Sequence, residues 1–495
     1  MNESQNNAIR QALKNSFTLI QGPPGTGKTV VGVHIVYWFH KMNLEASNAK
    51  KTRETNEAEE TKKTCILYCG PSNKSVDVVA EYLLRFTETL RPLRVYSEQM
   101  EMIEFPYPGS ILQLSRKSIR EGKPKAELRS ITLHHRIRTS QNPFSTLILS
   151  FDARIRREED LTDEEVEQYK HILSKARQYE LAKHDVILCT CTAAASPSLK
   201  LIVNPREILI DECAMATEPE ALIPLVSYKP EKIVLLGDHK QLRPIVQNEL
   251  LRKLGMEKSL FERYMDQAVM LDTQYRMHEE ICAFPSMEFY KGRLKTDVIR
   301  PTSVLHAEWK RCTPILFGHV VGEEVSLVVS SEKGNENSKA NLEEAEMAVR
   351  VAKLLINVSK VRPETIAILT PYNAQVSEIQ KLLLKSEIQN VAVSTIMKSQ
   401  GSEWRYVILS TVRSLPCSEI ETEPTKSWIM KNLGFVTDPN QVNVGITRAQ
   451  EGLCIIGNRN LLHCSSLWKK LLKHFTAKNC VVNAKDITVQ KPRAR

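Results

Sequence analysis

The sequence lacks the patterns that are typical of membrane-spanning, secreted and cysteine-ligated zinc proteins. None of its apolar runs reaches the length of about 18 residues that a membrane-spanning helix needs. No secretory signal stands at its start. Its 11 cysteines include no C-x-x-C pair, so we expect reduced thiols and no zinc site within the chain. Together these absences predict an intracellular protein of the cytoplasm, the nucleus or both.

The composition itself is that of a globular protein with more than one domain. Of 495 residues, 42% are hydrophobic and 25% are charged, which suffices for two or more domains with separate cores. The net charge of +10 permits a nucleic-acid partner. It does not require one, because many enzymes that act on neutral substrates are mildly basic.

One stretch carries a complete phosphate-binding loop. Residues 21–29 read Q-G-P-P-G-T-G-K-T, after an apolar run at 17–20 that predicts a strand and before an apolar run at 30–39 that predicts a helix. Backbone N–H groups would surround a triphosphate, Lys28 would reach its β- and γ-phosphates, and Thr29 would ligate Mg²⁺. A glycine-rich turn with a chance lysine is a poor alternative in this setting. The predicted nucleotide-binding residues here are Gly22, Pro23, Pro24, Gly25, Thr26, Gly27, Lys28 and Thr29.

Short apolar runs recur along the chain, most of them followed by polar loops, which is typical of parallel sheets. Further strands are predicted at 64–69, 186–190, 207–210, 232–236, 366–369, 391–394, 406–409 and 452–456. The fold class is therefore α/β, with two parallel-sheet domains in series. We place the first at 1–272 with an insertion at 95–183, the second at 273–482, and a basic tail at 483–495. The chain starts just before the phosphate loop, which favours a segment of a longer protein.

Some regions are predicted from their polar composition. Residues 43–63, 334–339 and 417–426 are expected to form surface loops. The insertion is expected to be mostly helical, with its own small fold and a capping box that begins at Thr162. It could grip nucleic-acid phosphates, Arg136 and Arg138 in particular, or simply present a solvated charged face. Its basic residues include Arg116, Lys117, Arg120, Lys123, Lys125, Arg129, His134, His135, Arg136 and Arg138.

Other candidate residues follow predicted strands. Asp211 and Glu212 form an acidic pair that suits a phosphoryl-transfer site, with the aspartate holding Mg²⁺ and the glutamate polarising the attacking water. Gln241 could sense the γ-phosphate. Arg448 could act as an arginine finger. Each of these residues taken alone is more often a surface or structural residue.

The order of the motifs resembles that of the superfamily 1 helicases, and within them the up-frameshift branch. The resemblance covers about residues 2–458 and rests on Gln5 together with GPPGTGKT, CGPSNKSVD, DECA, GDHKQLRP, TQYRM, TPYNAQ, QGSEW and VGITRAQ. Within the branch the sequence is most similar to the C-terminal helicase of the large helicases that also carry zinc fingers. The segments H-H-R-I-R at 134–138 and I-L-C-T-C at 187–191 are examples of this similarity.

The resemblance implies two RecA-like domains, ATP between them, and single-stranded nucleic acid, RNA or possibly DNA, that is followed from 5′ to 3′. Gln5 would read the adenine and Tyr275 would stack on it. Glu403 would hold the ribose, while Arg276 and Arg448 would contact the γ-phosphate. The positions that match strand-contacting motifs are Pro71, Ser72, Asn73, Thr190, Tyr372, Asn373 and Thr395.

The chain departs from the family pattern at Met397-Lys398-Ser399, where an aspartate and an aromatic residue are common, and at Trp404. Both positions bear on how hydrolysis is coupled to stepping, so ATP hydrolysis is better supported than processive unwinding. The resemblance also implies zinc-finger and exoribonuclease domains in the same polypeptide, and a role as a transcriptional coactivator with nuclear receptors. The alternative function is thus an interaction module, although the sequence has no L-x-x-L-L box to dock a receptor.

Overall fold

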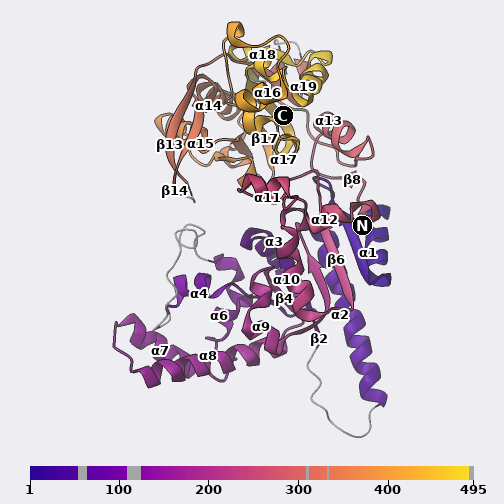
Figure 1. The fold of residues 1–495 in the computed structure, drawn as a ribbon, viewed down its shortest axis with the longest axis vertical. Helices are drawn as coiled ribbons and strands as arrows, with labels where there is room; N and C mark the ends of the chain where they lie inside the picture. The colour runs from indigo at the N-terminus through magenta and orange to yellow at the C-terminus, as the bar shows by residue number, and fades with distance from the viewer. Residues whose placement is uncertain (54–63, 107, 109–123, 308–310, 332–333, 490–495) are drawn as a thin grey trace. The chain divides into compact units, whose positions relative to one another are not determined.

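The computed structural model describes residues 1–53, 64–106, 108, 124–307, 311–331 and 334–489. The chain divides into two compact units. Unit 1 comprises Met1–Gly22, Gly27–His239 and Arg243–Leu271, and unit 2 comprises Pro23–Thr26, Lys240–Leu242 and Asp272–Arg495. Each unit is built around its own parallel sheet (Figure 1).

Unit 1 contains a seven-stranded sheet in the order β3-β4-β2-β5-β6-β1-β7. Every pair in it is parallel, so the carboxyl ends of all seven strands lie at one edge. The strands are β1 (Phe17–Gln21), β2 (Thr64–Gly70), β3 (Pro92–Arg94), β4 (Val186–Thr190), β5 (Asn204–Ile210), β6 (Lys232–Gly237) and β7 (Val269–Met270).

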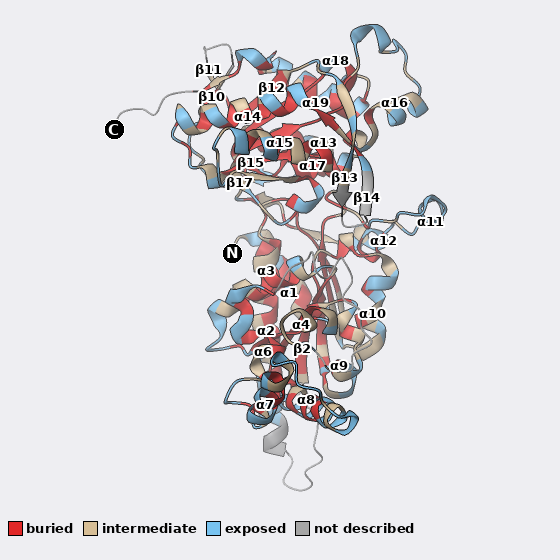
Figure 2. Cartoon of the chain, turned by 90° about the vertical axis from the view of Figure 1, so that its left-hand side faces the viewer, coloured by how far each residue is buried: buried red, intermediate tan, exposed pale blue. Residues whose placement is uncertain are grey.

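Alternate residues of these strands enter two separate cores, as a strand with both faces covered requires. In β2, Ile66 and Tyr68 pack with helices α1 (Glu3–Lys14), α2 (Lys28–Arg53) and α3 (Asn73–Leu83). Leu67 and Cys69 face the other core, which α8 (Asp163–Lys183), α9 (Pro197–Ile202) and α10 (Glu218–Tyr228) help to form. Figure 2 shows the buried residues concentrated along the strands and on the helix faces that cover them.

The insertion is helical, as predicted, but it does not have a separate core. Its described elements are α4 (Glu98–Glu104), a 3₁₀ helix (Ala126–Ile131), α6 (Leu133–Arg136), α7 (Ser145–Arg156) and α8. Ile148 of α7 and Leu173 of α8 belong to the same apolar cluster as Leu67 and Ile187 of the sheet. The expectation of an independent small fold is therefore wrong, because these helices cover a face of the sheet. The predicted basic residues Arg116, Lys117, Arg120 and Lys123 lie outside the described residues.

Unit 2 contains a six-stranded parallel sheet in the order β16-β15-β17-β18-β12-β19. Its strands are β12 (Ile315–His319), β15 (Ile366–Thr370), β16 (Ala392–Thr395), β17 (Trp404–Ser410), β18 (Ala449–Gly457) and β19 (Val481–Asn483). Helices α14 (Leu342–Asn357) and α15 (Asn373–Lys385) pack against one face. Helices α13 (Glu279–Tyr290), α17 (Pro439–Ile446) and α19 (Ser466–Ala477) also contact strands of this sheet. The predicted α/β class with two parallel-sheet domains is confirmed.

Several polar segments are more regular than their composition predicts. Residues 43–53 continue helix α2 rather than opening a loop, and 54–63 lie outside the described residues. The expected loop at 334–339 is part of β14 (Gly334–Asn341), which pairs antiparallel with β13 (Glu324–Ser331). Backbone hydrogen bonding to a neighbouring strand thus decides the structure of a stretch that has no apolar alternation.

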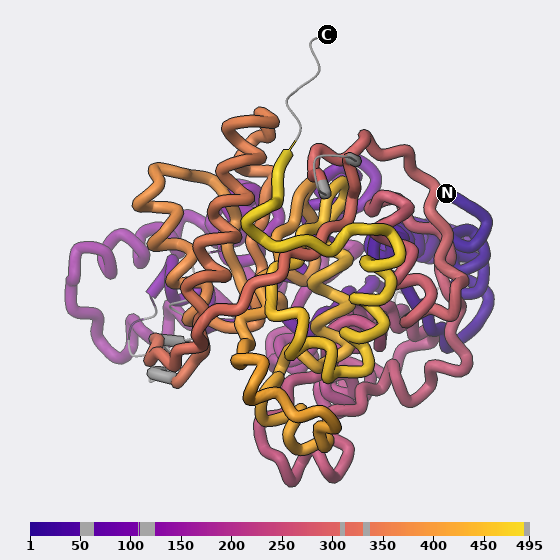
Figure 3. Tube along the Cα trace, turned by 90° about the horizontal axis from the view of Figure 1, so that it is seen from above, coloured from indigo at the N-terminus to yellow at the C-terminus, as the bar shows by residue number. Residues whose placement is uncertain are grey.

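The segment from Asn483 is a second departure. The sequence predicts a basic tail here, yet β20 (Thr488–Val489) pairs with β10 (Leu305–Ala307), while residues 490–495 of the predicted tail lie outside the described residues. Ile487 and Val489 are buried in the unit 2 core. The yellow end of the trace in Figure 3 follows this last described stretch.

The predicted capping box at Thr162 is confirmed, because Thr162 and Glu165 form it at the start of α8. Asn2 and Gln5 form another capping box on α1. Asn341 caps α14 by accepting a hydrogen bond from the backbone N–H of Glu344. Among the helices that the structure describes, none is long and apolar enough to cross a membrane.

Candidate nucleotide and nucleic-acid sites

The predicted phosphate loop joins the carboxyl end of β1 to the first residue of α2. Its close turns need glycine at specific places. Gly25 and Gly27 both have φ of 76°, a left-handed conformation that favours glycine. A Cβ on Gly22 would lie 2.6 Å from Cβ of Lys28, which no relaxed backbone would allow. The loop is therefore folded so that Lys28 opens α2, where backbone N–H groups and the helix dipole favour an anion.

Lys28 meets the acidic pair that follows β5. Its Nζ lies 2.8 Å from Oε2 of Glu212 and 3.6 Å from Oδ1 of Asp211. Lys28 and Asp211 are both buried. Burial by itself lowers the pKa of Lys28, but attraction to Glu212 and Asp211 outweighs it and the pKa is raised, so the ammonium stays charged. Burial raises the pKa of Asp211, with Glu212 adding to the effect and Lys28 opposing it.

Two residues that sequence reasoning missed support this cluster. The hydroxyl of Tyr68, on β2, donates to Oδ2 of Asp211 at 3.2 Å. That hydroxyl fits only because residue 32 is glycine, since a Cβ there would lie 2.5 Å from it. A glycine inside a predicted helix and a tyrosine in a buried strand were the available signals. Glu212 has φ of 51°, and a left-handed non-glycine residue of this kind is typical of functional sites.

Two glutamines border the loop in unit 1. Gln5 is buried, and its Nε2 lies 3.0 Å from the position that a Cβ on Gly27 would take. Its Oε1 accepts from the backbone N–H of Asn2 within the capping box. Gln21 donates from Nε2 to Oδ1 of Asp238 at 3.2 Å. The predicted adenine reader is thus adjacent to the loop, and its amide nitrogen faces the loop rather than the capping box.

Unit 2 gathers the second group of predicted nucleotide residues. Arg276 pairs with Glu403, with Nε 2.5 Å from Oε2, and Gln450 donates to the other oxygen of that carboxylate at 2.8 Å. Arg448 is only 1% exposed. Its guanidinium donates to the carbonyls of Val444 and Ser402 and to Oε1 of Gln241, which groups with this unit.

The predicted ribose and phosphate residues of unit 2 are therefore brought together. Tyr275, by contrast, is 37% exposed, as a residue that stacks on a ligand ring would be.

The predicted strand-contacting residues lie at the carboxyl edges of the two sheets. In unit 1, Thr190 is paired with Gly70, which directly precedes Pro71. Ser72 caps α3, and Oδ1 of Asn73 accepts from the buried Arg94 at 2.8 Å. These contacts place the residues of two separate motifs beside each other within unit 1.

In unit 2, Thr395 is paired with Thr370, and Tyr372 and Asn373 begin α15 a few residues after that strand. Tyr372 is 7% exposed, and its hydroxyl accepts from Nη1 of Arg413 at 3.4 Å. The ring of Tyr372 is therefore held in place and does not project freely into solvent.

The structure does not support the expectation that Arg138 grips nucleic acid. Its side chain is buried, its Nε lies 2.6 Å from Oδ2 of Asp152, and its guanidinium carbon lies 3.7 Å from the ring centroid of Phe105. Arg136 donates from Nη2 to Glu180 at 3.4 Å. That interpretation is wrong for Arg138, because the charge is compensated inside the insertion. Sequence reasoning could not see it, since the partner lies on a different helix.

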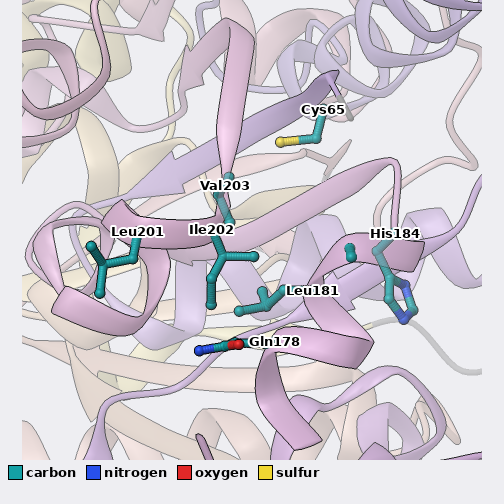
Figure 4. Close-up of a pocket in the computed structure, with 8 residues that line it drawn as sticks. Cys65, Gln178, Leu181, His184, Leu201, Ile202 and Val203 are labelled. Carbon is teal, nitrogen blue, oxygen red and sulfur yellow. The ribbon is translucent and has the colours of Figure 1, made fainter. Parts of the chain in front are cut away.

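A cavity of 320 Å³ lies at the opposite edge of the unit 1 sheet. Figure 4 shows its lining, which comes mainly from the end of α8 and from α9 and the residue after it. Cys65 and Val203 stand at or near the amino ends of β2 and β5, whereas Lys28 and Asp211 follow carboxyl ends. Because all these strands are parallel, the cavity is separate from the nucleotide site. The lining residues are Cys65, Gln178, Leu181, Ala182, His184, Leu201, Ile202 and Val203.

Comparisons with known proteins agree with this geometry. Two family models, each described as an AAA domain, match residues 1–249 and 256–460. A human protein described as 3′-5′ exoribonuclease HELZ2 is 58% identical over 99% of this chain. A regulator of nonsense transcripts 1 homolog from Neurospora crassa is 32% identical over 97% of it. The ATP-dependent helicase NAM7 of Saccharomyces cerevisiae is 31% identical over 97%.

The chain belongs to the up-frameshift-like superfamily 1 helicases. It is accordingly an ATP-hydrolysing enzyme of the helicase class. The chain spans 17% of the human relative, 39% of the Neurospora protein and 44% of the yeast helicase.

Proposed function

We propose that this helicase hydrolyses ATP in response to single-stranded RNA and uses the energy to move from 5′ to 3′ along it. The observation that carries the proposal is the convergence of Lys28, Asp211 and Glu212 at the carboxyl edge of the unit 1 sheet. Sequence separates the lysine from the acidic pair by most of unit 1, and only the fold brings them together.

The roles follow from the charges and their positions. With a triphosphate in the loop, Lys28 would turn from the acidic pair to the phosphates, which are the stronger anion. Glu212 would then be free to polarise a water molecule for in-line attack on the γ-phosphate. Burial is the setting in which such charges act most strongly, because water does not screen them.

The donor set at this edge fits Mg²⁺. Asp211 offers a buried carboxylate held by Tyr68, and the Thr29 hydroxyl stands one residue after Lys28. Oxygen ligands with several retained waters are what this ion prefers, and when bound it would neutralise phosphate charge. We assign Thr29 and Asp211 to hold it. Gln5, Tyr275 and Glu403 are assigned to the adenosine part of ATP.

Two arginines of unit 2 supply the remaining positive charge in the proposed mechanism. Arg448 donates to carbonyl and amide oxygens, which orient its guanidinium. Arg276 is bound to Glu403 and would exchange this partner for phosphate oxygens. We assign both arginines to the γ-phosphate, and Gln241, which Arg448 contacts, to sensing it.

The choice of RNA rests on the relatives. The human relative is named an exoribonuclease and the Neurospora relative a regulator of nonsense transcripts, and both names refer to RNA. We propose Pro71, Ser72, Asn73 and Thr190 in unit 1 and Tyr372, Asn373 and Thr395 in unit 2 as the strand-contacting residues. An exoribonuclease region elsewhere in the full-length protein would fit the same substrate. No observation in the described chain favours the coactivator alternative.

A single titration tests the core of this proposal. ATP turnover is measured with increasing single-stranded RNA and, separately, DNA of the same sequence, for the wild type and for Lys28→Ala. We expect RNA to stimulate the wild type more than DNA, and we expect Lys28→Ala to be inactive while its circular dichroism spectrum stays that of a folded protein. Turnover by a folded Lys28→Ala variant would refute the site, and equal or greater stimulation by DNA would refute the choice of RNA.

A further inference from the structure

The insertion contains a cluster of metal-ligating side chains that the nucleotide chemistry does not use. Glu104 ends α4, and His134 and His135 lie together on α6. The Nε2 atoms of His134 and His135 are 3.0 Å and 2.8 Å from the same oxygen, Oε2 of Glu104. Within the residues that the structure describes, this is the one group of three such side chains whose ligand atoms converge, all within 4.8 Å of one another.

These spacings suit a small metal ion. Zinc binds imidazole nitrogen and carboxylate oxygen at about 2.0–2.2 Å, so neighbouring ligands of a tetrahedral ion lie about 3.3 Å apart. The nitrogen–oxygen distances in the cluster are slightly shorter than that. A small outward movement of the side chains would admit the ion without moving the helices that carry them.

The groups around the cluster are those that a metal site needs. Nη2 of Arg129 donates to Oε1 of Glu104 at 3.3 Å, which holds the carboxylate by the oxygen that the histidines do not approach. His134 is buried, and its Nδ1 has no hydrogen-bond partner among the described residues. The carboxylate of Glu101 is 3.8 Å from that nitrogen and is itself bound by Arg177 at 2.5 Å.

The unpartnered nitrogen has a simple explanation if Nε2 of His134 binds a metal. A neutral imidazole carries one proton, and coordination through Nε2 leaves that proton on Nδ1. Nδ1–H would then lie 3.8 Å from Oε1 of Glu101, and a small approach would give the hydrogen bond by which outer carboxylates orient metal-bound histidines. Without a metal, a neutral ring that donates from Nε2 to Glu104 leaves Nδ1 as a buried acceptor facing a carboxylate, which is unfavourable.

We propose that Glu104, His134 and His135 bind one Zn²⁺ ion that fastens α4 to α6, with a water molecule in the remaining position. Two imidazoles and a carboxylate favour zinc over Mg²⁺ or Ca²⁺, which prefer all-oxygen sites. His135 is partly exposed, so the ion has access from solvent. The site takes no part in ATP hydrolysis. It contains no cysteine, so the expectation of no zinc site, which rests on the spacing of the cysteines, does not bear on it.

Zinc binding to the metal-stripped chain tests the proposal directly. Equilibrium dialysis and titration calorimetry with ZnSO₄ should give one tight site per chain. Glu104→Gln and His135→Gln should each weaken it by at least about tenfold, since even outer partners of a metal change affinity by that much. His171→Gln is the matched control, because His171 is an exposed histidine of the same insertion, on α8. It should bind like the wild type.

Two further measurements test which residues bind the metal and whether it stabilises the fold. Co²⁺ in place of zinc should give the visible absorption of a tetrahedral site without a thiolate charge-transfer band, which separates this site from the buried cysteines. Zinc should also raise the unfolding temperature of the wild type, and Mg²⁺ should not do so through this site. The proposal is overturned if the wild type takes up no zinc, if both variants keep it, or if the cobalt spectrum shows thiolate ligation.

Discussion

The cations of the two candidate clusters, Lys28 in unit 1 and Arg448 in unit 2, are held by different kinds of contact. In unit 1, Lys28 stands beside two carboxylates, so the charge of the lysine is already compensated. In unit 2, the contacts that hold Arg448 include two carbonyls and an amide oxygen, which are neutral. A balanced cluster is stable without ligand and must be rearranged by it. A guanidinium oriented by neutral oxygens can exchange them for the oxygens of an incoming phosphate, which bind it more strongly.

Each unit also buries one glutamate whose pKa is raised to about 7, Glu207 in unit 1 and Glu344 in unit 2. Burial is the main cause in both, but the surroundings differ. Glu207 accepts from Asn43 at 2.8 Å. Glu344 accepts from Ser410 and from the backbone N–H of Val412, which has φ of 72°. A left-handed β-branched residue is strained, so the unit 2 glutamate also holds a strained backbone conformation.

The largest expected effect tests the Arg448 guanidinium that neutral oxygens orient in unit 2. Arg448→Ala should lower the ATP turnover rate by about 10³-fold or more, as loss of other arginine fingers does. Nucleotide affinity should change far less, because most ground-state contacts come from the loop at Lys28. Lysine should rescue little, since it lacks the planar fork. Steady-state turnover with saturating RNA and equilibrium binding of a fluorescent ATP analogue check this.

The exposed Arg459 of the same unit provides the control, and Arg459→Ala should leave both quantities unchanged. If Arg448→Ala lost binding in proportion to turnover, Arg448 would be a ground-state ligand, and the contrast between the units would fail.

The next effect concerns a compensated charge in unit 1. Arg138→Ala leaves the buried Asp152 with the Tyr169 hydroxyl but without its charged partner, so it should lower the free energy of unfolding by about 3–5 kcal/mol. Arg157→Ala, in which the side chain lost is 74% exposed, should change it by less than about 0.5 kcal/mol. Urea unfolding followed by circular dichroism measures both. Equal small effects would show that the insertion is not part of the unit 1 core.

The buried glutamates give the pH dependence of each unit. For Glu344 the folded pKa of about 7 lies above the ordinary value of 4.5. Between those values the folded chain holds a proton that the unfolded chain releases, so stability is greater at low pH and falls as pH rises through this window. The difference of about 2.5 units corresponds to about 3 kcal/mol. Glu344→Gln should remove this slope from the unfolding of unit 2.

Glu207→Gln is the paired variant in unit 1 and should flatten that unit's slope in the same window. The unfolding midpoint of each variant is followed from pH 5 to 8 by a probe within its own unit. A slope that persists in Glu344→Gln, or that disappears from both units in a single variant, would contradict the assignment.

The smallest effect tests the supporting hydroxyl of unit 1. Tyr68→Phe removes the hydrogen bond to Asp211 and nothing else of similar size, so kcat/KM for ATP should fall by about tenfold. The loss should depend on the Mg²⁺ concentration, because Asp211 is the proposed ligand. Tyr228→Phe, which removes a hydroxyl bound to a backbone carbonyl elsewhere in unit 1, should not show that dependence.

How much of the fold and of the candidate site could be predicted from the sequence depends on how far apart in the sequence the interacting residues are. The strand at Phe17–Gln21, the loop at Lys28 and the acidic pair at Asp211 were predictable, because each is a local pattern and parallel strands bring their carboxyl ends together. The roles of Tyr68 and Gly32 were not, since a tyrosine in a buried strand looks like ordinary core.

Partners on other elements account for the remaining differences. Arg138 looked available because Asp152 is on another helix, and Glu104 lies 30 residues from His134. The pairing of β14 with β13 could not be read from the polar residues of β14 alone. In each case the information lies in which elements the fold places side by side.

The shared core of the insertion has a consequence for how such a protein can be shortened or diversified. Ile148 and Leu173 pack in the cluster that contains Leu67 and Ile187 of the sheet. Removing the insertion would therefore expose apolar sheet residues to water, and a truncated chain would tend to aggregate whatever its catalytic state. A shortened chain that stays in solution would therefore also need polar residues in place of Leu67 and Ile187, so the insertion and the sheet cannot be altered separately.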